Sequence, residues 1–217
     1  MSKTPRRRYD STRRREQAQR TRRAILEAAG RLFAERGYGS TKLTAVAEAA
    51  GVAVDTVYAA YGSKAGLLRA LVTTALRGAE DGVPLRQSSA IGAIRAEPDA
   101  RRKLTLYGEL LAEVNPRLAP LARVLREAAS TEPEIAEMWA DLQDDRLDGM
   151  REFAAHLKNA GALRAGVSQA QARDVLWALA SPELHDLLVR ARGWSAKRYG
   201  AWVAEQMMAA LVDQPEA

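Results

Sequence analysis

Apolar side chains recur at helical spacing along most of the chain, and this periodicity predicts an almost wholly helical protein. The clearest example is a helix that begins near Glu16. Its apolar face consists of residues at positions i, i+4, i+7 and i+8, namely Ile25, Ala29, Leu32 and Phe33. We expect this helix to end at Gly37, because a residue without Cβ adopts positive φ at little cost.

Two short helices are predicted to follow, separated by only about three residues (51–53). Thr41 is the expected N-cap of the first, and apolar residues repeat at helical spacing until Gly51. The second contains Val57, and Ser63 then provides the N-cap of a fourth helix that is rich in leucine. The segment therefore predicts several short helices in close succession.

Changes in composition divide the chain into three parts. Residues 1–15 have almost no apolar content, which predicts a disordered basic arm. Residues 16–78 hold the helices described above, and a stretch rich in Gly, Pro and Ser beyond residue 78 indicates a hinge. Residues 79–217 are predicted to form a second helical domain.

Helix starts in the second domain are marked by residues that cap or begin helices. Pro98 lies ahead of one helix, and Asn115 is interpreted as an N-cap with Pro116 at the first helical position. Thr131 is expected to cap a long helix that ends at Gly161. Further predicted starts are Ser168 with Gln171 as a capping box, Ser181 with Pro182, and Ser195. In total we expect nine to eleven helices and no strand.

Composition agrees with an all-α fold and excludes several classes of protein. The chain has 43 Ala and 25 Leu but only 13 Val and 4 Ile, so helix formers far outnumber β-branched residues. The absence of Cys excludes disulfide scaffolds and thiol catalysis. Charged residues interrupt every apolar stretch, and no apolar run follows the N-terminal arginines, so we expect neither a membrane span nor a secretory signal. A soluble, cytoplasmic protein is predicted.

The positive charge of the chain is concentrated at its start. The net charge is +6, yet residues 1–23 alone carry +8 and the first 78 residues carry +10. The remaining residues therefore sum to −4. A basic front and a mildly acidic rear indicate that the front meets a polyanion, whereas a solvated basic tail is the alternative interpretation.

Residues 42–61 have the properties of a helix-turn-helix motif. Ala47 is small enough to allow the two helices to cross, and Gly51 suits a turn that needs positive φ. An ordinary corner between two helices would satisfy the same packing requirements. The motif by itself therefore leaves DNA binding and a purely structural role open.

The stretch from Arg23 to Leu71 resembles the DNA-binding domain of TetR-family transcriptional repressors. The likeness is carried by Ile25 to Ala29, Leu32 to Tyr38, Thr41, Val46, Ala47, Ala49 to Val52, Thr56 to Tyr58, Tyr61 and Ser63 to Leu68. The resemblance implies three N-terminal helices that bind double-stranded DNA. It also implies a helical C-terminal domain that binds a small molecule and forms a homodimer. No catalytic activity, cofactor or metal is expected.

The resemblance and the residue chemistry together give candidate contacts to DNA. Thr41 and Lys42 lie at a helix start, where free N–H groups favour phosphate, and Lys64 matches a backbone-contacting lysine of the family. The recognition helix offers Val54, Asp55, Thr56 and Tyr58 as candidates. Asp55 is interpreted equally well as a charge that stabilises the helix start. Ala53 replaces the usual Ser of the family, so the N-cap of this helix is lost.

The second domain offers candidates for a dimer face and an effector pocket. Apolar positions of the closing helices are assigned partly to a homodimer interface and partly to the core: Val175, Leu176, Leu179, Leu184, Leu187, Leu188, Trp202, Val203, Met207 and Leu211. The pocket candidates are Tyr107, Met138, Trp139, Met150, Phe153, His156 and Trp177. Because most of them are apolar, we expect an apolar or aromatic effector, with His156 as a polar handle. Ordinary core packing is the alternative for each of them.

Two further functions are compatible with the sequence. Acidic residues run along one predicted helix between Glu134 and Glu152, with His156 four residues later, and such a row could hold a metal in a helical enzyme. A solvated acidic face is the preferred interpretation, since two His and no Cys are a poor supply of ligands. A basic protein that packages DNA without sequence preference is the other alternative.

Overall fold

The computed structural model describes residues 6–77 and 83–213, and it is helical throughout these two ranges apart from short connections. Its helices are α1 (Arg6–Ser40), α2 (Leu43–Ala50), α3 (Val54–Tyr61), α4 (Lys64–Ala75), η1 (Leu85–Gln87), α5 (Ser89–Ala96), α6 (Ala100–Ala128), α7 (Pro133–Asn159), α8 (Gln169–Leu179), α9 (Pro182–His185), η2 (Asp186–Ala191) and α10 (Ala196–Leu211). Within the described ranges there is no strand, so the predicted all-α class is confirmed. The chain divides into two compact units, Met1–Leu71 and Val72–Ala217.

The first unit is built from α1, α2, α3 and the first part of α4. Its core contains side chains from all four helices that have no exposed surface: Ile25, Phe33, Val46, Val57, Leu67 and Leu68. Phe33 stacks on Tyr38 with 5.7 Å between the ring centroids. Gly37 interrupts the end of α1 with φ 74°, as its position in the sequence predicted. The short helices are therefore held by one shared apolar core.

Two features at the ends of α1 differ from the sequence-based expectations. Helix α1 begins at Arg6, whereas residues 1–15 were expected to form a disordered arm; residues 1–5 lie outside the described part. Thr41 does not cap α2, because Lys42 is the N-cap and makes no side-chain cap bond. The Thr41 hydroxyl instead donates to the carbonyl oxygens of Leu32 (3.2 Å) and Gly37 (2.8 Å). Thr41 therefore ties down the end of α1.

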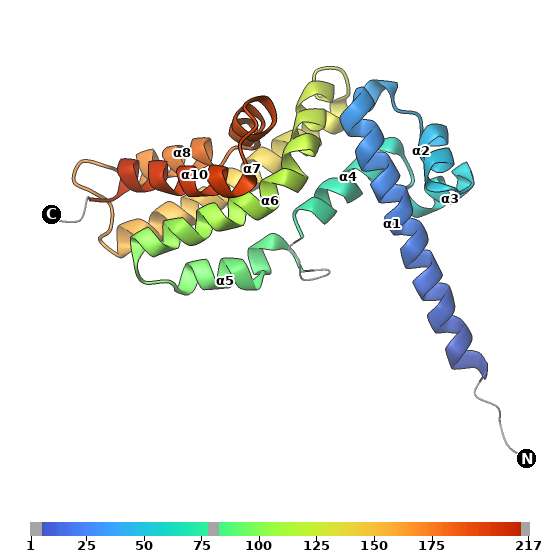
Figure 1. The fold of residues 1–217 in the computed structure, drawn as a ribbon, viewed down its shortest axis with the longest axis horizontal. Helices are drawn as coiled ribbons and strands as arrows, with labels where there is room; N and C mark the ends of the chain where they lie inside the picture. Colours follow the sequence, from blue (N-terminus) through green and yellow to red (C-terminus); the bar gives the residue numbers. More distant parts are fainter. Residues whose placement is uncertain (1–5, 78–82, 214–217) are drawn as a thin grey trace, which may run out of the picture. The chain divides into compact units, whose positions relative to one another are not determined.

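The second unit is organised around α6. Figure 1 shows α5 and α10 flanking this long helix, and α6 also packs on α7 and α9. Helix α8 packs on both α7 and α10. The crossing of α6 and α10 is very close: a Cβ added to Gly108 would lie 2.4 Å from the carbonyl oxygen of Gly200. Glycine is required on both helices at this crossing, because any side chain would meet backbone.

Helix α6 continues through the point where a new helix was expected. The prediction that Asn115 and Pro116 begin a helix is wrong, since both residues lie inside α6. Asn115 is 2% exposed and its Nδ2 donates to the Tyr199 hydroxyl at 2.9 Å. The amide thus serves a contact to α10 rather than a cap. Apolar burial along both flanks of Pro116 stabilises the helix despite the lost backbone donor.

The other predicted caps have mixed outcomes. Thr131 was expected to cap α7, but Glu132 occupies that position and the Thr131 hydroxyl donates to the carbonyl of Ala128 at 3.3 Å. The capping box of Ser168 and Gln171 and the caps Ser181 and Ser195 are all present. Gly161 follows the end of α7 with φ 66°, as expected. Local capping chemistry therefore predicted most helix starts of the second unit.

The helices of the described ranges do not have the length and apolar character of a membrane span. No single one of them is long and apolar enough to cross a bilayer. Helices α2 and α3 reach the length and composition of a span only when they are taken together. The chain bends by 108° between them.

Candidate nucleic-acid interface and ligand cavity

Helices α2 and α3 form a compact pair with a sharp bend between them. Each has eight residues, and the chain bends by 108° between them. Gly51 makes the turn in the left-handed conformation, with φ 67° and ψ 34°, and its N–H and that of Val52 donate to carbonyls of α2. A bend of this size with a glycine turn is the geometry of a helix-turn-helix. The predicted need for positive φ at Gly51 is confirmed.

The inner and outer faces of this pair differ sharply. Leu43, Val46 and Ala47 of α2 and Val57 of α3 are buried. On the outer face of α3, Asp55, Tyr58 and Ala59 share one side of the helix and are exposed. Tyr58 is 51% exposed, which is unusual for a side chain of its size. The outer face of α3 therefore carries a carboxylate, a phenol and a methyl group.

The candidate DNA contacts of α2 and α3 have different exposures. Lys42 is fully on the surface at the start of α2, where the first N–H groups of the helix have no side-chain cap. Val54 and Thr56 are half-buried at the start of α3, whose N-cap Ala53 also provides no side-chain bond, as predicted. Both helix starts therefore have backbone donors that are open to a phosphate.

Thr41 and Lys64 make internal contacts. Thr41 is 1% exposed and its hydroxyl is engaged inside the unit, so its side chain does not face solvent. The Lys64 ammonium donates to the carbonyl of Gly39 at 3.4 Å and lies 4.1 Å from the Tyr38 ring centroid. Ser63 caps α4 by accepting the Gly66 N–H at 2.9 Å, as predicted. Lys64 thus links the start of α4 to the end of α1.

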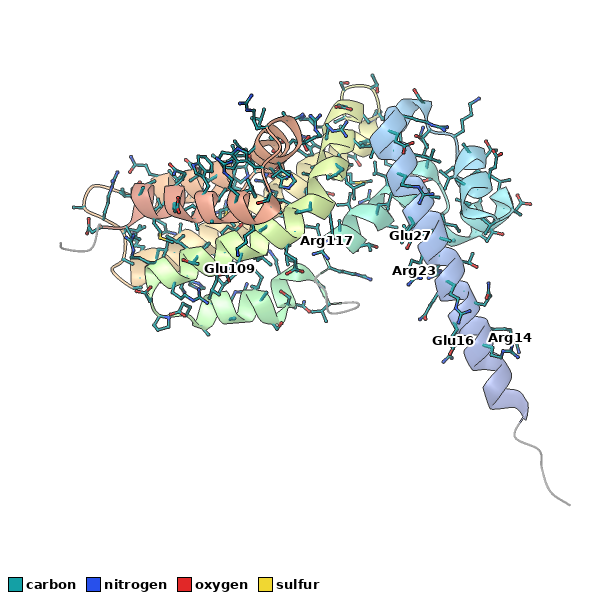
Figure 2. All side chains as sticks on the ribbon, in the orientation of Figure 1. Arg14, Glu16, Arg23, Glu27, Glu109 and Arg117 are labelled. Atoms are coloured by element: carbon teal, nitrogen blue, oxygen red, sulfur yellow. The ribbon has the colours of Figure 1, made fainter. Side chains whose placement is uncertain are left out.

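The N-terminal part of α1 is an exposed arginine-rich helix. Arg14 and Glu16 project from it, and Arg23 pairs with Glu27 one turn further on at 3.5 Å (Figure 2). All the arginines between residues 13 and 23 are exposed. At its inner end, the Tyr61 hydroxyl donates to the carbonyl of Arg22 at 3.1 Å, and burial raises the pKa of this phenol. The charge of residues 1–23 was the sequence signal for this surface.

The second unit contains a cavity of about 390 Å³. It is lined by the end of α4 and the residues that follow it, by η1, α5, α6 and α7, and by Ala180. Four predicted pocket residues line it, namely Tyr107, Met150, Phe153 and His156. The rings of Tyr107 and Phe153 meet edge to face at 5.1 Å, and the Tyr107 hydroxyl contacts the Met150 sulfur at 3.6 Å. The volume lies in the range of small-molecule sites.

Three other predicted pocket residues do not line this cavity. Met138 is 4% exposed and belongs to the core, and Trp139 is half-buried. Trp177 lies beside the Arg146 guanidinium, which is 5.3 Å from its ring centroid and donates to its carbonyl oxygen at 3.0 Å. A large apolar side chain at helical spacing does not by itself distinguish a cavity wall from the core.

Charged cavity residues were missed by the sequence reasoning. Lys103 and Arg146 both line the cavity, and each stands one helical turn before a predicted pocket residue, Tyr107 and Met150 respectively. That spacing was the available signal. Burial lowers the pKa of Arg146, which Tyr107 partly opposes, and burial raises the pKa of Tyr107. The cavity is therefore less purely apolar than expected.

The acidic residues of α7 do not gather into a cation site. Across the described ranges, no group of three or more His, Asp or Glu side chains is arranged to hold a metal ion. Glu152 pairs with Arg95 at 3.1 Å and with Arg86 at 3.7 Å. The two histidines also lie far apart in the sequence, and His185 is buried against the Tyr199 ring.

These features define the class of the protein: an all-α chain with a helix-turn-helix followed by a helical unit that holds a ligand-sized cavity. The sequence model of the family described as "Bacterial regulatory proteins, tetR family" matches residues 25–71. The match covers all of α2 and α3 and the buried face of α1. No curated protein is significantly similar to the chain in sequence.

Solved structures resemble the whole chain. NalD of Pseudomonas aeruginosa, the secondary repressor of the MexAB-OprM multidrug efflux pump, aligns with a TM-score of 0.68 at 24% identity, covering 91% of this chain and 98% of NalD. SmeT in complex with triclosan aligns with a TM-score of 0.63 at 25% identity, covering 89% and 92%. A putative regulator from Saccharomonospora viridis in complex with choline gives 0.65 at 20% identity, covering 89% and 98%. Residues 25–71 therefore match the DNA-binding part of TetR-family regulators, and the chain shares the all-α fold of these solved structures.

Proposed function

We propose that the protein is a homodimeric repressor that binds a palindromic operator and is released from it by a small, largely apolar effector. The observation that carries the proposal is the pairing of two features in one chain. One is the helix-turn-helix with exposed Tyr58, and the other is the cavity of about 390 Å³ in a separate unit. A DNA-packaging protein needs no such cavity, and an enzyme needs no recognition helix.

The DNA contacts in this proposal divide by chemistry. Lys42 and the open backbone donors at the starts of α2 and α3 bind phosphates, with the Tyr58 hydroxyl as a further donor. Val54, Asp55 and Thr56 read base edges, with a thymine methyl as the partner of Val54 and a cytosine amino group as that of Asp55. Thr41 and Lys64 act from within, by holding the ends of α1 and α4 in place.

A second copy of the chain is part of the proposal, because one helix-turn-helix reads only a half-site. Several apolar residues of the closing helices remain partly exposed in the single chain: Val175, Leu179, Leu184, Leu187, Leu188 and Trp202. Leu187 is 61% exposed. We assign these residues to the dimer face, whereas Leu176, Val203, Met207 and Leu211 are core. Exposed leucines of this kind are typical of an interface.

Effector control acts through α4 in this proposal. The helix begins at Lys64, and Thr73 near its end lines the cavity. A ligand that fits the cavity better in one arrangement of α4 stabilises that arrangement. Release from DNA requires that this arrangement is the one incompatible with the operator.

The test combines operator binding with effector release. Fluorescence anisotropy with the DNA upstream of its own gene is compared with a scrambled duplex at one salt concentration. A repressor prefers the operator by about a thousandfold or more. Tyr58→Ala should lower this affinity at least tenfold, whereas Leu187→Ala should leave the half-site contacts intact and weaken dimerisation in sedimentation velocity. Equal binding to both duplexes would favour the packaging protein and contradict the proposal.

Release is tested with a metabolite panel. Compounds that raise the melting temperature of the free protein should also dissociate the operator complex, because both effects follow from binding to the same arrangement. A compound that stabilises the protein but leaves DNA binding unchanged would contradict the coupling.

A further inference from the structure

The charged groups around the cavity are mostly positive. Five of its lining residues are Lys or Arg and two are acidic. One of the two carboxylates, Glu152, is already shared by Arg86 and Arg95. The other, Asp145, is exposed on α7. The cavity therefore has a surplus of positive charge that its own carboxylates do not neutralise.

Lys103 is the most deeply buried of the positively charged residues that line the cavity. Only 7% of the surface of this residue is exposed. Its ammonium donates to the carbonyl oxygen of Arg95 at 3.2 Å. In the described ranges no carboxylate lies within ion-pair distance of it. An ammonium has three donors, so two remain after the Arg95 contact.

A buried cation without a counter-charge lowers stability, and a ligand that supplies the counter-charge gains from that deficit. Arg146 adds to the same potential, because its guanidinium donates its hydrogen bonds to the neutral Gln143 side chain and the backbone carbonyl of Trp177. The rest of the wall is apolar and aromatic, with Leu110, Leu111 and Phe153 as examples. The matching ligand has a negative head on an apolar body.

We propose that the effector is an amphipathic organic anion, and that its carboxylate pairs with the Lys103 ammonium while its apolar body lies along α6 and α7. This inference rests on the proposed function, because it takes the cavity as the effector site. The sequence predicted an apolar or aromatic effector, and the charge of the cavity restricts this class to acids that carry an apolar body. A neutral molecule of the same shape leaves Lys103 unpaired and binds more weakly.

Three probes with a linear chain of ten carbons and different head groups test the sign of the charge: decanoate, decanamide and decyltrimethylammonium. Isothermal titration calorimetry with the full chain in about 0.15 M salt should give decanoate at least tenfold higher affinity than decanamide. Decyltrimethylammonium should bind more weakly than decanamide. This comparison uses only the unmodified protein, so it does not depend on the folding of a variant.

A matched pair of variants then assigns the preference to one residue. Lys103→Met keeps an unbranched side chain of nearly the same length, removes its charge, and should reduce the advantage of decanoate over decanamide to less than threefold. Arg102→Met is the control, because Arg102 is the neighbouring exposed cation of α6 and pairs with Glu109 at 3.7 Å. It should retain the tenfold preference.

Each outcome distinguishes this inference from the proposed function. Equal affinity for decanoate and decanamide overturns the anion preference and leaves an apolar effector cavity standing. Failure of all three probes also overturns it, and the operator measurement then decides separately whether the protein is a repressor. An equal loss of preference in Lys103→Met and Arg102→Met would mean that overall charge, and not Lys103, selects the acid.

Discussion

Residues that are adjacent in the chain, or of the same type, have different roles in this protein. Thr41 is buried and donates inward, whereas Lys42 next to it is exposed at the start of α2. Lys64 contacts the Tyr38 ring, whereas Lys103 in the second unit has only a carbonyl partner in the described residues. Environment rather than residue type therefore decides whether a cation is structural or available to a ligand.

Lys42→Ala tests the phosphate contact at the start of α2. We expect weaker binding to every DNA sequence by a similar factor, because a phosphate contact carries no sequence information. The slope of log K against log salt should become less negative by about one unit. Anisotropy titrations from about 0.05 to 0.2 M salt measure both effects. Arg117→Ala, at an exposed arginine of α6 (Figure 2), is the control and should change neither.

The burial of His185 predicts that the stability of the second unit depends on pH. His185 is 5% exposed, packs against the Tyr199 ring at 5.1 Å, and neither of its ring nitrogens has a partner in the described residues. Burial lowers the pKa of this imidazole, and the neighbouring Asp186 partly opposes the shift. Below the ordinary value of about 6.5, the unfolded chain takes up a proton that the folded chain does not.

The melting temperature should consequently fall between pH 7.5 and 5.5, and His185→Phe should lose part of that fall. Differential scanning calorimetry at several pH values measures the two slopes. Identical slopes for the variant and the unmodified protein would show that His185 does not contribute.

At the scale of elements, capping chemistry and backbone approach explain how the helices are placed. The second unit has side-chain caps at Ser168, Ser181 and Ser195, whereas α2 and α3 have none. The N–H groups at the starts of these two helices have no side-chain acceptor, which lowers the stability of the helices. The same groups can donate hydrogen bonds to an anion such as a phosphate. A stability cost at a functional site is a common compromise.

Ala53→Ser tests this compromise. Ala53 has the extended conformation of an N-cap, with φ −70° and ψ 147°, so a serine hydroxyl there can accept an N–H of the first turn of α3. We expect a gain of roughly 0.5 to 2 kcal/mol in the stability of the first unit by chemical denaturation. Ala59→Ser, on the exposed face in the interior of α3, should not stabilise. No gain from Ala53→Ser would mean that the helix start is already satisfied.

Gly108→Ala tests the close crossing of α6 and α10. The added Cβ would lie 2.4 Å from the Gly200 carbonyl oxygen, so one helix must move. The expected loss is about 1 to 3 kcal/mol of unfolding free energy. Gly92→Ala in α5 is the control, because no atom lies within 4 Å of its Cβ and alanine favours a helix. Equal stability of the two variants would contradict the crossing.

At the scale of the whole molecule, charge and cavity are separated between the two units. Residues 1–71 carry a net charge of +9 and residues 72–217 carry −3, and the cavity lies in the second unit. The exposed arginines of α1 extend the positive surface beyond the helix-turn-helix. In the proposed function, charge of this kind supplies affinity that does not depend on the DNA sequence, while α3 supplies selectivity.

Deletion of residues 1–15 tests the role of this arm. Affinity for the operator should fall and its dependence on salt should flatten, because seven of the ten cations before residue 24 are removed. Substitution of three exposed arginines of α6 with glutamine, namely Arg102, Arg117 and Arg126, is the charge control and should leave the slope unchanged. An unchanged slope after the deletion would contradict a role in binding.

Local sequence signals were sufficient where neighbours in the chain decide the structure. Gly37, Gly51 and Gly161 have positive φ as predicted, and Ser168 and Gln171 form the predicted capping box. Local signals failed where a residue far away in the sequence decides the structure. Asn115 and Pro116 have the signature of a helix start, but Asn115 instead bonds to Tyr199, which is 84 positions away. Arg6 begins a helix although the segment lacks an apolar face.

The sequence by itself determined the helical class and the helix-turn-helix around Gly51, because these depend on periodicity, composition and the conformations open to single residues. The tertiary structure alone decided which side chains line the cavity and which face the core. Met138 and Met150 have the same chemistry and the same helix, yet only Met150 borders the cavity. That difference arises from the packing of α6 and α7 around an empty volume, which no spacing along one helix encodes.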